Sequence, residues 1–135
     1  MGHEDSSLAR SLVKMKMGLV LLINFDETQT TAAVQALAEI GLRAQACRPG
    51  PQLYRWIRLK PIDMAWVVLP MTAVEDAFLL YRLRRAIPGI RIGLLVESGV
   101  SPNERQRFRA LGAGLVLRRG IRPAVLALAT KGLLS

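Results

Sequence analysis

The chain has 135 residues, 51% of them hydrophobic, and a formal net charge of +9 at pH 7. Its length suits one domain with one core, and its apolar content is too high for a disordered chain. One cysteine and one histidine exclude an internal disulfide and a Cys/His zinc site. No apolar run reaches the roughly 18 residues of a membrane span, so membrane insertion is not expected.

The first residues are polar and contain acids, without the pattern of a secretory signal. We expect a flexible tail over residues 1–17 and one domain over residues 18–135. The lone Cys47 fits a reducing compartment, so we expect a cytoplasmic protein and a buried, inert thiol.

Apolar segments of strand length alternate with helical segments along the chain. Strands are predicted at 18–25, 42–47, 64–69, 90–97 and 114–117, and helices at 26–41, 51–61, 73–89, 101–113 and 122–135. Asp26 is placed to cap the first helix, and Ser101 with Pro102 to begin the fourth. This alternation predicts an α/β fold with a five-stranded parallel sheet and helices on both faces, in a flavodoxin-like order.

Four segments resemble, in order and spacing, those of CheY-like response-regulator receiver domains. They are "LLINFDE" (21–27), "KPIDMAWVVLP" (60–70), "IRIGLLVESG" (90–99) and "RFRALGAGLVLRR" (107–119). The resemblance covers roughly residues 18–134 and implies a (βα)5 three-layer sandwich. It also implies a bacterial type of signal transduction, in which a histidine kinase phosphorylates an aspartate of the receiver domain.

The family's phosphorylation pocket contains an acidic pair that holds Mg²⁺, an acceptor aspartate, a hydroxyl and a lysine. Carried onto this chain, the acidic pair falls on Asn24 and Phe25, the acceptor on Val68, the hydroxyl on Val96 (with Ser98 two residues on), and the lysine on Arg118 or Arg119. A valine cannot attack phosphorus, and Mg²⁺ prefers carboxylate oxygens. We therefore expect a pseudo-receiver, a domain that keeps the receiver fold without its phosphorylation chemistry. Such a domain is not an enzyme, binds no metal or cofactor, and is not phosphorylated.

Other readings of these residues are possible. Matching Pro70 instead to a proline after the acceptor moves the acceptor to Trp66, which is not an acid either. Asp63 stands at the start of its strand, away from the carboxyl edge where α/β sites form. Asn24, Asp26 and Glu27 could hold a cation, but capping of the first helix is the simpler role. Trp56 and Trp66 fit the core better than a stacking platform.

The expected output is protein–protein contact, in the manner of a two-component system. The candidate surface comprises the last two helices and the fifth strand, with Arg105, Arg109, Arg118, Arg119 and Arg122. The final helix is apolar nearly all round, which favours a homodimer or a docked partner, and the positive charge favours an acidic one.

Three alternatives stay open for the basic residues and the fold. The arginines could bind nucleic acid, although no recognition motif is present. They could also be no more than solvated surface charge. A ligand-binding or enzymatic flavodoxin-like domain is disfavoured, because "INFDETQT" (23–30) lacks the glycines of a dinucleotide loop.

Overall fold

The computed structural model describes residues 19–59, 61–70, 73–97 and 100–135. The predicted tail over residues 1–17 and Ser98 lie outside the described residues.

The described residues form one five-stranded parallel sheet, as predicted. Its strands are β1 (Leu19–Ile23), β2 (Arg43–Cys47), β3 (Ile62–Val68), β4 (Arg91–Val96) and β5 (Ala113–Arg118). They pair in the order β2-β1-β3-β4-β5, so β2 and β5 are the two edges. The carboxyl ends of all strands consequently lie along one edge of the sheet.

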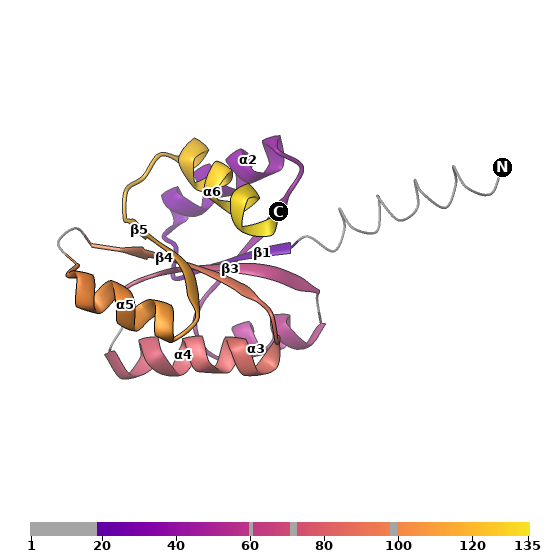
Figure 1. Ribbon diagram of the computed structural model, residues 1–135. Helices are drawn as coiled ribbons and strands as arrows, with labels where there is room; N and C mark the ends of the chain where they lie inside the picture. The colour runs from indigo at the N-terminus through magenta and orange to yellow at the C-terminus, as the bar shows by residue number, and fades with distance from the viewer. Residues whose placement is uncertain (1–18, 60, 71–72, 98–99) are drawn as a thin grey trace.

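Helices cover both faces of this sheet. They are α2 (Glu27–Glu39), α3 (Pro51–Leu59), α4 (Ala73–Ala86), α5 (Pro102–Ala110) and α6 (Pro123–Leu134). Figure 1 shows α2 and α6 on one face and α3, α4 and α5 on the other. The predicted (βα)5 three-layer sandwich is confirmed.

The helix starts follow the local chemistry of the sequence. The Asp26 side chain accepts from the Gln29 amide, and the Gln29 side chain accepts from the Asp26 amide, which makes a complete capping box. The Ser101 side chain likewise accepts from the Glu104 amide, and Pro102 follows it as predicted.

Two strand boundaries differ from the prediction by two residues, and the other described boundaries by at most one. β1 ends at Ile23, two residues early, because Asn24 turns the chain with φ at 67°. β3 begins at Ile62 rather than at residue 64, so Asp63 is its second residue, far from the carboxyl edge.

Side chains alternate between the two faces of the sheet and make two cores. Ile23, Val67 and Val96 belong to the core under α3, α4 and α5. Trp66 and Val68 belong to the core under α2 and α6. β1, β3 and β4 are thus buried on both faces, which explains their continuous apolar runs.

Trp66 links the sheet to α6 through the second core. Its indole is fully buried, and Nε1 donates to Oγ1 of buried Thr130 at 2.8 Å. That hydroxyl in turn donates to the Leu126 carbonyl at 2.7 Å. On the neighbouring strand only a glycine leaves room for the ring, because a Cβ at Gly93 would lie 2.4 Å from Trp66 Cζ3. Trp66 is therefore a core residue, as expected.

Candidate functional site

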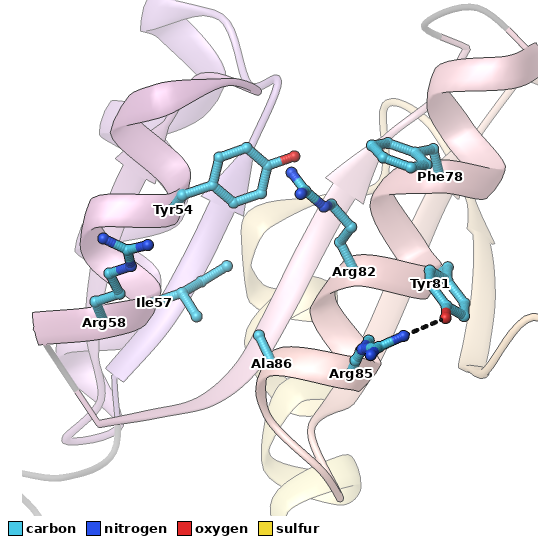
Figure 2. A pocket seen from close by; sticks show the side chains of 8 residues that line it. All are labelled: Tyr54, Ile57, Arg58, Phe78, Tyr81, Arg82, Arg85 and Ala86. Carbon is cyan, nitrogen blue, oxygen red and sulfur yellow. Dashed lines mark hydrogen bonds between the residues drawn. The ribbon is translucent and has the colours of Figure 1, made fainter.

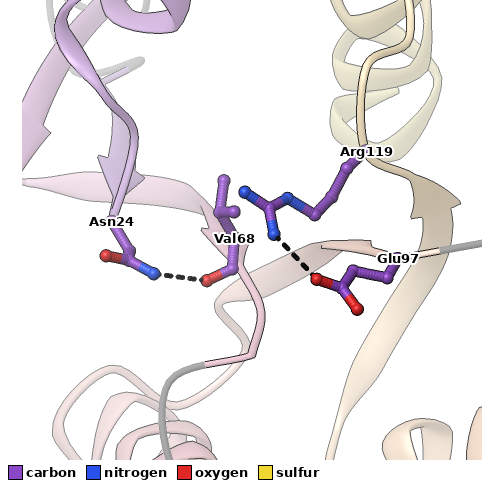
Figure 3. A network of polar contacts seen from close by, with 4 residues as sticks. All are labelled: Asn24, Val68, Glu97 and Arg119. Carbon is purple, nitrogen blue, oxygen red and sulfur yellow. Dashed lines mark hydrogen bonds and ion pairs between the residues drawn. The ribbon is translucent and has the colours of Figure 1, made fainter.

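The carboxyl edge of the sheet, the place of a receiver's phosphorylation pocket, contains Asn24, Val68, Val96, Glu97 and Arg119. The strand register brings them together, because Ile23 pairs with Val67, Val68 with Leu95, and Val96 with Arg118. Residues that stand far apart in the sequence therefore meet at this edge (Figure 3).

Asn24 bridges the ends of β1 and β3. Its side-chain Nδ2 donates to the Val68 carbonyl at 2.8 Å, and its backbone N–H donates to the Cys47 carbonyl at 3.3 Å. Asparagine tolerates the positive φ of this turn better than most residues. The side chain that stands at a metal-ligand position of the family thus holds two strand ends together.

Val68 and Val96 are part of the packed interior. They are only 2% and 3% exposed, and they belong to different cores. The Val96 carbonyl also accepts from the Arg119 amide at 2.6 Å. Neither side chain has an atom that can accept a phosphoryl group.

An ion pair crosses the same edge between β4 and β5. Arg119 Nη1 lies 3.4 Å from Glu97 Oε1, and both side chains are substantially exposed (Figure 3). Of the two residues matched to the family's lysine, Arg119 is the one that reaches across this edge, whereas Arg118 is the exposed last residue of β5. Sequence reasoning missed Glu97 as the partner.

Phe25 lines a small cavity of about 210 Å³ between the first turns of α2 and α6. The walls of this cavity also include Ala33, Leu95 and Leu126, so it is largely apolar. A hard cation needs several oxygen ligands. Of the side chains in these walls only Thr28 and Gln29 carry oxygen, and Gln29 Oε1 already accepts from the Asp26 amide in the capping box.

The remaining carboxylates near the sheet have other surroundings. Asp26 caps α2, as the simpler interpretation has it. Asp63 lies at the amino-terminal end of β3, where burial raises its pKa and the charge of Arg91 partly offsets that rise. Among the described residues, no group of three or more His, Cys, Asp or Glu side chains could hold a metal ion.

The arginines of the predicted interaction surface differ in their contacts. Arg105 on α5 donates from Nη1 to the Val116 carbonyl of edge strand β5 at 3.2 Å. Arg119 is paired with Glu97, while Arg109, Arg118 and Arg122 are exposed. On α6, Val125 is 44% and Leu128 67% exposed, so the apolar surface of that helix is only partly covered.

A groove between α3 and α4 was missed by sequence reasoning. It has a volume of about 530 Å³ and is lined by aromatic, aliphatic and arginine side chains (Figure 2). The sequence signal lies in Arg58, Arg82 and Arg85, but these arginines are spread over two predicted helices, whereas residues 101–135 hold seven basic residues in one segment.

Comparison with known proteins agrees with the geometry. The structure superimposes on a response regulator from Thermotoga maritima with a TM-score of 0.78, at 18% identity over 87% of this chain and 97% of that one. The chemotaxis protein CheY4 from Vibrio cholerae gives 0.75 at 18% identity over 87% and 99%. A pilus assembly-related protein from Burkholderia pseudomallei K96243 gives 0.70 at 19% identity over 89% and 91%.

The chain has the receiver-domain fold. The resemblance to CheY-like receiver domains is thereby confirmed at the level of the fold. No protein-family model and no curated protein matches the sequence. Within the described ranges of this receiver fold, no helix is long and apolar enough to cross a bilayer.

Proposed function

We propose that this chain is a non-catalytic signalling module of the two-component type, a pseudo-receiver that acts without aspartyl phosphorylation. The observation that carries the proposal is that a buried valine, Val68, stands at the carboxyl end of β3. Its carbonyl accepts from the side-chain Nδ2 of Asn24. A phosphoryl group needs a nucleophile and a bound cation at this place. The Val68 side chain is no nucleophile, and among the described residues no group of three or more His, Cys, Asp or Glu side chains could hold a metal ion.

The direct test is incubation with a small phosphodonor and Mg²⁺, followed by intact-mass spectrometry. The proposal predicts no gain of a phosphoryl group, with a phosphorylatable receiver domain run beside it as the positive control. A phosphorylated, hydroxylamine-labile species would contradict it.

The output of such a module is contact with another protein through α5, β5 and α6, either a second copy or an acidic partner. Support comes from exposed Val125 and Leu128 on α6, since exposed apolar residues on one helix favour an interface. The exposed cations Arg118 and Arg122 flank this helix and favour a partner of opposite charge.

Sedimentation of the wild type beside Leu128→Glu tests self-association. A homodimer through α6 predicts that only the variant sediments as a monomer. Capture of partners from native extract, with the triple variant Arg118→Glu, Arg119→Glu, Arg122→Glu alongside, tests the acidic partner. Loss of the same partners from the triple variant is the expected result.

Nucleic-acid binding through the basic C-terminal third is the second candidate. The exposed arginines favour it, whereas Arg105 and Arg119 already make contacts within the chain. Phosphate contacts would make the affinity fall steeply with salt. A gel shift that is absent even at low salt would eliminate this candidate.

A further inference from the structure

The two helical layers of the protein differ in charge. Helices α3, α4 and α5 carry eight arginines against three acids, whereas α2 and α6 carry one lysine against two acids. The positive charge of the α3–α4–α5 layer therefore favours an anionic partner there as well.

The α3–α4 groove in this layer combines arginines with exposed apolar side chains. Phe78 is 52% and Tyr81 55% exposed on α4, and Ile57 and Ala86 add aliphatic surface. A second hollow of about 480 Å³ adjoins the groove, since Tyr54 and Arg58 line both. Together the two hollows offer an extended path along α3 that combines apolar surface with arginines.

Arg82 lies at the centre of the groove. Its guanidinium carbon is 4.5 Å from the centre of the Tyr54 ring and 5.0 Å from the centre of the Phe78 ring (Figure 2). This stacking joins α3 to α4 and fixes the orientation of the guanidinium. The N–H edge of a stacked guanidinium is still able to pair with a carboxylate.

Arg58 and Arg85 place two more cations on the same groove. Arg85 Nη1 donates to the Tyr81 hydroxyl at 2.8 Å, which uses one of the five N–H groups of the guanidinium. Among the described residues, every charged side chain that lines the groove is an arginine. A partner segment must therefore bring negative charge as well as apolar side chains.

We propose that the α3–α4 groove is a docking site for an acidic protein segment that carries interspersed apolar side chains. Its carboxylates pair with Arg58, Arg82 and Arg85, and its apolar side chains cover Phe78 and Tyr81. Single-stranded nucleic acid fits less well, because Arg82 already occupies ring faces of Tyr54 and Phe78 on which bases would stack. The inference is independent of whether the carboxyl edge can be phosphorylated.

Fluorescence anisotropy with three labelled probes tests the proposal. The probes are a peptide of alternating Glu and Leu, a Glu/Ser peptide of equal charge, and oligouridine of equal charge. We expect the Glu/Leu peptide to bind most tightly, and changes in backbone amide shifts to concentrate on α3 and α4. The double variant Arg58→Glu with Arg85→Glu should weaken binding of the Glu/Leu peptide by at least about tenfold, since two attractions to its carboxylates become repulsions.

Matched variants locate the contact. Arg118→Glu with Arg122→Glu changes the charge equally on the α5–β5–α6 surface and should alter the affinity less than about twofold, a change of about 0.4 kcal/mol at most. Arg82→Lys keeps the charge but loses the planar stacking, so it should also weaken binding. Thermal unfolding confirms that each variant is folded.

Three results would overturn the proposal. They are tighter binding of oligouridine than of the Glu/Leu peptide, an equal loss of affinity in the two double variants, and no binding of either peptide by the wild type. The phosphodonor assay is unaffected by any of them, so failure of this inference and failure of the proposed function can be told apart.

Discussion

Trp66 Nε1 and Thr130 Oγ1 form a hydrogen bond of 2.8 Å between two fully buried residues, one on β3 and the other on α6. It satisfies the indole N–H inside an apolar core. The bond also fixes the position of α6, whose opposite side carries the exposed Leu128. The internal packing of the domain and its proposed contact surface are thus connected through one helix.

Thr130→Val should lower the free energy of unfolding by about 1–3 kcal/mol, because the buried indole N–H loses its acceptor. Urea unfolding measures the change. Thr31→Val is the matched control, since it removes only a hydrogen bond from an exposed hydroxyl to the Glu27 carbonyl. Equal stability of the two variants would show that the buried bond contributes nothing.

Gly93→Ala should destabilise the protein by about 1–3 kcal/mol, because the added Cβ overlaps the Trp66 ring. Gly132→Ala on α6 meets no atom within 4 Å and should instead stabilise the helix by up to about 1 kcal/mol. Thermal unfolding of both variants provides the comparison. A neutral Gly93→Ala would mean that the indole has room to move.

At Asn24 we expect replacement by alanine to cost about 1–3 kcal/mol. The change removes the hydrogen bond to the Val68 carbonyl and forces alanine into a positive φ. Asn24→Gly loses the same bond but accepts the backbone angle, so it should be about 1 kcal/mol more stable than the alanine variant. If glycine is no better than alanine, the turn is not strained.

Burial raises the pKa of Cys47 to about 11 from an ordinary value of 9.0. The unfolded thiol therefore ionises at lower pH than the folded one, and stability falls as pH rises from 9 towards 11. The loss should be on the order of 2 kcal/mol. Urea unfolding at several pH values measures it, and Cys47→Ala should flatten the slope over this window. An unchanged slope in that variant would assign the loss to other groups.

The fold could be predicted from the sequence because its signals are local. Apolar runs of strand length predict β1, β3 and β4, and Asp26 and Ser101 predict helix starts. These local signals together predict the alternating order of strands and helices. The predicted end of β1 was wrong by two residues. The residues "INF" (23–25) contain no glycine that would predict the positive φ of Asn24.

The site could be predicted only in part. The resemblance gave the positions Val68 and Val96, which the parallel register brings to one edge. The pairing of Glu97 with Arg119 and the stacking of Tyr54 on Arg82 could not be predicted. These pairs join residues 22 and 28 positions apart, on different elements, and their contact depends on side-chain directions that periodicity does not specify.

The central claim is that the carboxyl edge cannot receive a phosphoryl group. Its most direct test is a titration of isotope-labelled protein with Mg²⁺ and beryllofluoride, an analogue of the phosphoryl group on aspartate, followed through the backbone amides of Asn24, Val68 and Val96. We predict that these three signals do not move at millimolar Mg²⁺. Saturable shifts of all three on addition of beryllofluoride with Mg²⁺ would contradict the claim.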